Sequence, residues 1–144
     1  MIVNRITFFL FTLIVLITLS GPAYTNVGEI GQVEGSAVIE RDATIVIEGK
    51  AGVGVESMDT AVTAKGTMRI NFIDQTRVEL TEQSRLVIDE FVYDPGRDLG
   101  TLSLKASLGT IRYASGQIAK RYKQNVKIRT PSATIGVRGT DFIM

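Results

Sequence analysis

Alternation of apolar and polar residues with a period of two runs through the middle of the chain. Three stretches show it, at residues 68–73, 77–80 and 85–88, and polar turns separate them. Because successive side chains of a strand point to opposite faces, each stretch has one face for a core and one mostly for water. The strands recur at roughly 8 to 12 residues, and no stretch of helix length shows a 3.6-residue period. The sequence therefore predicts a single all-β domain of many short strands, either solenoid-like or a sandwich.

Three aspartates recur at a constant interval through the same region. Asp59, Asp74 and Asp89 lie fifteen residues apart, and each follows a Met or an Ile. One interpretation is a solenoid whose coils each place an aspartate at a corner. The interpretation that we favour is three turns, in which aspartate bonds its own backbone. A row of Ca²⁺ sites is not indicated, because the sequence lacks the glycine-rich acidic loops that supply six or more oxygen ligands.

The composition excludes several classes of site. The chain has 144 residues, enough for one domain with its own core. It contains no His and no Cys, which removes the imidazole base, the thiolate nucleophile, the disulfide and the Cys/His zinc site. No serine lies in a Gly-x-Ser-x-Gly elbow, and no phosphate-loop motif is present. We therefore expect a protein that is not an enzyme and that holds no cofactor or metal.

Charge is divided unevenly along the chain. From Asn26 to Leu104 there are fourteen acidic and seven basic residues, whereas from Lys105 onward there are eight basic residues and one acidic residue. Opposite charges are favourable neighbours across strands. We therefore expect the two halves to face each other, with the last strands pairing with the middle ones.

One cluster of basic residues is a candidate interaction patch. Lys120, Arg121 and Lys123 surround Tyr122 in the only stretch with a candidate helical turn, residues 115–124. Such a patch would suit an anionic surface, such as lipopolysaccharide phosphates, or an acidic partner. The alternative, which we favour, is a solvated loop, since Lys and Arg are mostly exposed without any partner.

The N-terminal residues, 1–25, have the three parts of a secretory signal peptide. One charge, Arg5, precedes an almost entirely apolar run at 6–19, and small residues with a proline follow. Cleavage fits after Ala23 or after Thr25, although an apolar run extended to Ala23 would also suit an uncleaved anchor. We therefore expect an N-terminal signal helix, followed by a β domain at 26–144 that is periplasmic or secreted.

The C-terminal stretch carries the most specific motif. Residues 126–142 read as strand, corner, strand, glycine kink and strand. Together with Ile70-Asn71-Phe72-Ile73-Asp74 and the segment from Leu86 to Asp89, this stretch closely resembles the signature of the FecR-domain family. The signature positions that we single out, and take as structural, are Thr130, Pro131, Arg138, Gly139 and Thr140.

The resemblance implies an extracytoplasmic β-rich module. Similar domains occur in membrane-bound regulators of extracytoplasmic sigma factors, which sense transporter occupancy, and in secreted or periplasmic proteins. A regulator of that kind needs a sigma-factor-binding segment in the cytoplasm, which residues 1–5 are too short to provide. We therefore expect a domain that binds an unidentified envelope protein or surface component, with no nucleic acid and with membrane contact only through an uncleaved N-terminus. A membrane-anchored sensory domain related to ferric-siderophore regulators is the alternative.

Three positions refine these expectations. The family often has Asp-Gly where this chain has Asp74-Gln75, so the turn is expected to be looser or of another type. The chain stops at Met144 inside a predicted strand, where family members usually continue, so we expect C-terminal truncation. Arg138 is expected to bind backbone carbonyls or Asp141, and replacing it with Ala is expected to lower thermal stability.

Overall fold

Strands make up most of the chain. The computed structural model describes residues 25–136 and 141–143. The strands in this part are β1 (Gly28–Arg41), β2 (Ile45–Glu48), β3 (Gly54–Val55), β4 (Thr60–Phe72), β5 (Arg77–Leu80), β6 (Arg85–Asp94), β7 (Leu99–Leu108), β8 (Ile111–Ala114), β9 (Val126–Arg129), β10 (Thr134–Gly136) and β11 (Asp141–Ile143). Between β8 and β9 lie one helical turn, α2 (Gln117–Arg121), and a 3-10 turn, η1 (Lys123–Asn125). The prediction of an all-β protein is confirmed.

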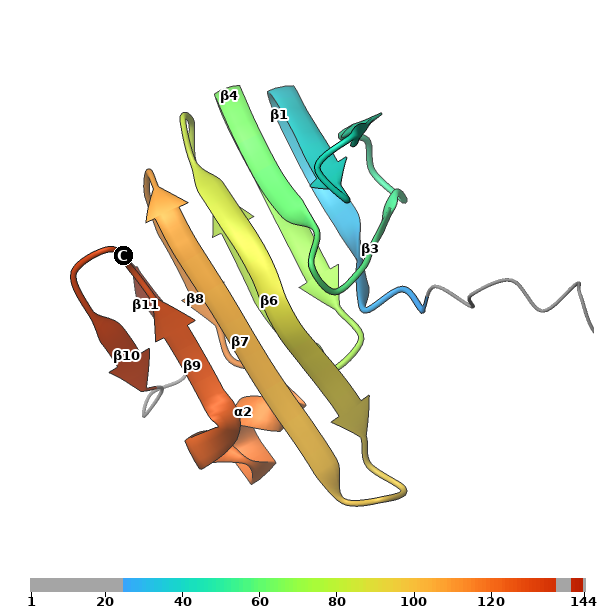
Figure 1. Cartoon of the computed structure of the whole chain (residues 1–144), viewed down its shortest axis with the longest axis vertical. Coiled ribbons are helices and arrows are strands. Elements are labelled where there is room, and N and C mark those ends of the chain that lie inside the picture. The colour runs from blue at the N-terminus through green and yellow to red at the C-terminus, as the bar shows by residue number, and fades with distance from the viewer. Residues whose placement is uncertain (1–24, 137–140, 144) are drawn as a thin grey trace, which may run out of the picture.

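The strands form one open mixed sheet. Its path runs β10-β9-β7-β6-β4-β5-β8-β11, and β1 pairs with β4, β2 and β3. Figure 1 shows β6, β7 and β9 side by side with β8 behind them. Among the described strands, β7 and β9 are the parallel pair. The finer choice between a solenoid and a sandwich stays a prediction, and the expected signal helix lies outside the described residues.

β4 is the strand on which the two halves of the sheet meet. Its first residues, Thr60–Val62, pair with β6, and its later residues, Met68–Asn71, pair with β5. The strands beyond β6 form one wing, β7-β9-β10, and the strands beyond β5 form the other, β8-β11. β1 pairs along nearly the whole of β4 and therefore runs across both wings.

The two wings close on one hydrophobic core. Its side chains come from β6, β7 and β9 on one wing and from β5 and β8 on the other. Phe72 at the end of β4 stacks on Phe91 of β6 with ring centroids 5.3 Å apart, although β4 and β6 pair only near the start of β4. Each fully buried aliphatic or aromatic side chain contributes about 1.5–3 kcal/mol. Burial on both wings requires them to fold toward each other.

A pair of glycines lets the sheet bend. Gly35 of β1 lies opposite Gly66 of β4, beside a register shift. Their φ angles are 80° and 133°, which residues with a side chain rarely adopt. A Cβ on Gly66 would overlap the carbonyl oxygen of Glu34, and a Cβ on Gly35 would overlap that of Lys65. The bend of the β1–β4 pair therefore requires that neither Gly35 nor Gly66 carries a side chain.

The turn between β4 and β5 is tight and is bonded to α2. The buried Asp74 carboxylate accepts hydrogen bonds from Thr76 N at 3.0 Å, Thr76 Oγ1 at 2.8 Å and Ile118 N at 3.1 Å. The Asp74 carbonyl oxygen accepts a further bond from Gln117 N at 2.7 Å. Gln75 adopts a φ of 70°, in the left-handed region that glycine favours in turns. The sequence allowed a looser turn at Asp74-Gln75, but the turn in the structure is tight.

The three regularly spaced aspartates do not act alike. Asp59, like Asp74, bonds local backbone, since it accepts from Glu56 N at 2.8 Å. Asp89 lies within β6 and accepts from the Ser103 hydroxyl at 2.9 Å. The turn interpretation is confirmed for the first two and wrong for Asp89. In the part of the chain that the structure describes, no group of three or more His, Cys, Asp or Glu is placed to hold a metal ion.

The two oppositely charged halves are joined by few ion pairs. Among the ion pairs between described residues, Asp89–Arg129, at 3.7 Å, is the one that links the acidic half with the basic half. β10 pairs with β9, and β11 pairs with β8. The expectation that the last strands pair with the middle ones is therefore wrong. The position of β9 follows apolar burial instead, because Val126 and Ile128 are buried beside Leu102 and Leu104 of β7.

The bend predicts an unequal response of two glycines to alanine. Gly66→Ala introduces both an unfavourable φ and a backbone overlap, and is expected to lower the free energy of unfolding by about 3 kcal/mol or more. Gly52 also has a positive φ, 89°, but has open space around it, so Gly52→Ala is expected to cost about 1 kcal/mol. Urea denaturation measures both. An equal loss of unfolding free energy in the two variants would contradict the proposed role of the Gly35–Gly66 pair.

A buried tyrosine predicts a change in alkaline stability. Burial raises the pKa of Tyr113, against the opposing effect of hydrogen bonds with Ser115 and Thr76. As pH rises above about 10, the usual tyrosine value, the unfolded chain loses this proton while the folded chain keeps it, so stability falls. Between pH 8 and pH 10.5, the urea midpoint of the wild type should therefore fall more than that of Tyr113→Phe. An identical fall in both proteins would show that Tyr113 does not contribute.

Candidate functional site

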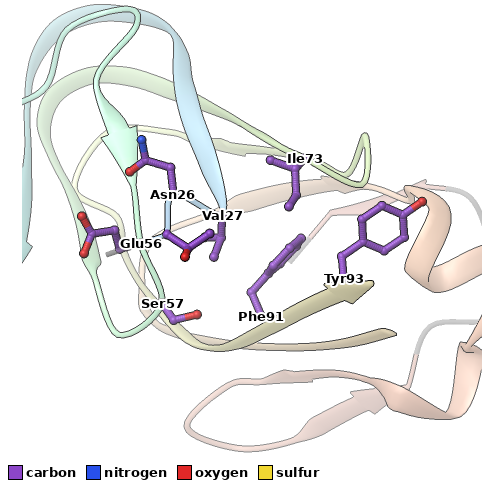
Figure 2. Close-up of a pocket in the computed structure, with 8 residues that line it drawn as sticks. Asn26, Val27, Glu56, Ser57, Ile73, Phe91 and Tyr93 are labelled. Carbon is purple, nitrogen blue, oxygen red and sulfur yellow. The ribbon is translucent and has the colours of Figure 1, made fainter. Parts of the chain in front are cut away.

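A pocket of about 350 Å³ opens where the chain enters the domain. Figure 2 shows its apolar lining, made of Val27, Ile73, Phe91 and Tyr93. Polar side chains complete the lining: Thr25, Asn26, Glu56 and Ser57. Phe91 and Tyr93 point the same way because they lie two residues apart on β6. The pocket thus combines two aromatic rings with a polar side.

The entering segment is fixed to the sheet at the edge of this pocket. Val27 N donates to Val55 O at 2.8 Å, and Val27 O accepts from Ile73 N at 3.0 Å. Val27 is buried, whereas Ile73 is 54% exposed. An isoleucine that projects this far into solvent beside an aromatic pocket offers an apolar contact to a partner.

An ion-pair cluster fixes the polar side of the pocket. The guanidinium of Arg41 donates to both carboxylate oxygens of Asp59, at 2.9 and 2.7 Å, and lies 2.7 Å from Glu56 Oε1. It also donates to Gly54 O at 3.2 Å. The hydrogen bonding to Asp59 raises the pKa of Arg41, against a smaller lowering by burial. The pairing holds Glu56 in place at the edge of the apolar lining, and because one guanidinium serves two carboxylates, the cluster keeps a formal charge of −1.

Two of the predicted signature residues form the corner between β9 and β10. Thr130 N donates to Ala133 O at 2.8 Å, and Ala133 N donates back to the Thr130 hydroxyl at 3.1 Å. The threonine side chain thus replaces a backbone carbonyl in closing the hairpin. Pro131, which lies between Thr130 and Ala133, is exposed and has a fixed φ. Arg138, Gly139 and Thr140 lie outside the described residues, so their expected roles stay predictions.

The signature also links the two ends of the strand path. β10 and β11 are the terminal strands of that path, yet only residues 137–140 separate them in the chain. Five steps of at most about 3.6 Å span roughly 18 Å. The two edges of the open sheet therefore lie near each other.

The predicted interaction patch is exposed around a buried anchor. Lys120, Arg121 and Lys123 face solvent, while Tyr122 is 8% exposed and its hydroxyl donates to Asp98 Oδ1 at 2.7 Å. This bond is the main cause of the raised pKa of Tyr122. The three basic residues do not share one site. Lys120 lines a hollow on the sheet, and the other two are not among the residues lining it.

Sequence reasoning missed the aromatic pocket. Phe91 and Tyr93 are out of phase with Leu86 and Ile88, because the register of β6 shifts between Ile88 and Glu90. A period of two continued from Ile88 would therefore have placed both aromatic residues on the solvent face. The alternation at 68–73 placed Ile73 on the solvent face, in keeping with its exposure, but nothing in that pattern indicated a pocket beside it. The pairing of Glu56 with Arg41 joins residues fifteen positions apart and has no local pattern.

The family of the chain is shown by its sequence. The model of the FecR protein family matches residues 58–144, which comprise β4 to β11 and the whole signature. The chain belongs to the FecR family. No curated protein and no solved structure matches it. Among the described residues of this FecR domain, no helix has the length and apolar character needed to cross a membrane.

The hairpin corner predicts a specific role for one hydroxyl. Thr130→Val keeps the shape of the side chain but leaves the Ala133 amide without its partner, so we expect a loss of about 1 kcal/mol of stability. Exchange of the Ala133 amide hydrogen should accelerate. Thr44→Val is the control, because the Thr44 hydroxyl only donates to a turn carbonyl and the change leaves no amide unpaired. Unchanged exchange at Ala133 in Thr130→Val would contradict this account of the corner.

Proposed function

We propose that this FecR domain is a non-enzymatic, extracytoplasmic module that binds a protein at the cell envelope. The pocket of Figure 2 is the proposed contact, and the exposed Ile73 beside Phe91 and Tyr93 is the observation that carries the proposal. Membership of the FecR family supports an envelope-associated, signalling-related role. The proposed location is periplasmic or secreted, in keeping with the apolar N-terminal run.

The shape and rigidity of the pocket favour binding of a side chain from a partner. A volume of about 350 Å³ lies at the small end of the range for ligand pockets. Aromatic anchors in well-packed pockets dominate the energetics of protein interfaces. The Arg41–Asp59–Glu56 cluster and the hydrogen bonds of Val27 hold the lining in place. Little conformational entropy is then lost on binding.

The position of the entering segment favours a second candidate, a membrane-anchored sensory domain. Thr25, Asn26 and Val27 line the pocket, so a retained N-terminal anchor would hold this pocket close to the membrane. Its partner would then be a membrane protein, and occupancy of the pocket would report the state of that protein. The two candidates share the same contact and differ in whether the N-terminal residues are kept.

Photo-crosslinking in the native host tests the contact. A photoreactive residue at Ser57, exposed and lining the pocket, is expected to form an adduct with one discrete partner. Ile73→Asp should abolish that adduct, because it places a charge in an apolar contact. Val46→Asp is the matched control, since Val46 is 67% exposed on β2 and does not line the pocket.

The adduct also separates the two candidates. An adduct that survives Ile73→Asp, or that both substitutions remove equally, would overturn the proposed contact. The mass of the crosslinked chain reports its N-terminus. Absence of residues 1–23 supports the released module, and their presence supports the anchored sensor.

A further inference from the structure

A second hollow, of about 590 Å³, collects positive charge from three separate elements. Arg69 comes from β4, Arg77 from β5 and Lys120 from α2. The remaining lining consists of Gly31, Asn71, Phe72, Gln75 and Ser115. No carboxylate is among these lining residues, and none of them lines the aromatic pocket. The hollow is thus a separate site with a net positive lining.

Strand register explains why the two arginines meet here. Asn71 of β4 pairs directly with Arg77 of β5, and Arg69 pairs with Glu79. Paired positions in an antiparallel sheet have Cβ atoms about 5 Å apart, and diagonal neighbours lie about 7–8 Å apart. Arg69, Asn71 and Arg77 all lie on the outer face, because the residues that alternate with them are buried. The arginines are therefore fixed as diagonal neighbours.

Lys120 is brought to this face by the Asp74 turn. Ile118 N bonds the Asp74 carboxylate and Gln117 N bonds the Asp74 carbonyl, which fixes the first turn of α2. The Gln117 side chain also donates to Gln75 Oε1 at 3.2 Å. Lys120 follows on the same short helix, and its position over the outer face depends on these bonds.

The charges of the hollow are only partly compensated within the described part of the chain. Arg69 lies 3.6 Å from Glu79 Oε2 and donates to Gln32 Oε1 at 3.1 Å. Arg77 and Lys120 are exposed and form no ion pair with a described residue. Two further acidic residues lie near in register: Glu29 pairs with Asn71, and Asp141 pairs with Ala114, which also pairs with Arg77. At least two cations are thus available to an external anion.

Asn71, which lines the hollow, has a side-chain oxygen without a partner among the described residues. Its Oδ1 is shielded from solvent and has no hydrogen-bond partner in the described structure. An unpaired buried polar atom costs about 1–3 kcal/mol. The NH₂ end of the same amide lies beside Gly31 in the lining of the hollow, and it can donate to an anion there. Gly31 leaves the necessary room, because a Cβ there would overlap the Asn71 amide.

We propose that this hollow binds a phosphate group. Guanidinium groups match phosphate oxygens with paired hydrogen bonds, and a lysine ammonium adds a point charge. The Asn71 amide and the exposed Gln75 add neutral donors. The phosphate belongs either to a lipid headgroup or to a soluble phosphorylated compound, and both present the same chemistry to these side chains. This inference goes beyond the proposed partner contact and does not depend on it.

Calorimetric titration of the full chain in detergent with inorganic pyrophosphate tests the site. Arg77→Gln combined with Lys120→Gln is expected to weaken binding at least tenfold. Arg121→Gln combined with Lys123→Gln removes the same charge from neighbouring positions that do not line the hollow, and should change binding less than twofold. Asn71→Asp should also abolish binding, with a thermal midpoint near that of the wild type to show that the chain is folded.

Vesicles distinguish the two sources of phosphate. The readout is the increase in binding when phosphatidylglycerol replaces part of the phosphatidylcholine, which corrects for any binding of the apolar N-terminal run to both lipids. An increase that Arg77→Gln/Lys120→Gln removes, without pyrophosphate binding, identifies a lipid headgroup. Pyrophosphate binding without that increase identifies a soluble ligand. Equal losses in the two double variants, or no binding of either probe by the wild type, would overturn the proposal.

Discussion

The buried carboxylate of Asp74 is the interaction on which both candidate sites depend. It is fully shielded from water, and its oxygens accept hydrogen bonds from Thr76 and from the first turn of α2. Hydrogen bonds to a charged group are worth about 1.5–3 kcal/mol, and a buried charge without them is strongly destabilising. Closure of the turn and docking of α2 are thus one event. Gly116 permits this close approach, because a Cβ there would overlap the turn.

The residues on either side of Asp74 belong to different sites. Ile73 projects beside the aromatic pocket, while Gln75 lines the basic hollow together with Lys120 of α2. The bent β1–β4 pair contributes to both sites, since Val27 directly precedes β1 and lines the aromatic pocket, while Gly31 of β1 lines the basic hollow. A FecR domain of this shape therefore places an apolar contact and a cationic contact near one rigid corner. The proposed partner contact and the proposed phosphate site would thus lie close together.

Local sequence patterns predicted the strands well, but they did not predict the contacts between residues that are far apart in the chain. The alternation at 68–73, 77–80 and 85–88 reappears in β4, β5 and β6. Each residue of these strands faces either the core or solvent, so the pattern can be seen in the local sequence. The bend at Gly35 and Gly66 could not be predicted, since each glycine is explained only by the strand opposite. The charge distribution led to a wrong prediction of how the last strands pair, because apolar burial of Val126 and Ile128 outweighs exposed ion pairs. Lys120 meets Arg69 and Arg77 in the lining of the basic hollow, and no local pattern could show this, because the two arginines are forty or more residues away in sequence.

Hydrogen exchange at the Ile118 amide, compared between the wild type and Asp74→Asn, tests this account most directly. Asparagine keeps the size of the side chain but removes the charge and one of the acceptor oxygens. The account predicts that Ile118 exchanges at least a hundredfold faster in the variant, while core amides such as Ile70 of β4 slow or quicken far less. Protection of Ile118 equal to that of the wild type would show that Asp74 does not hold α2, and the common origin of the two sites would be wrong.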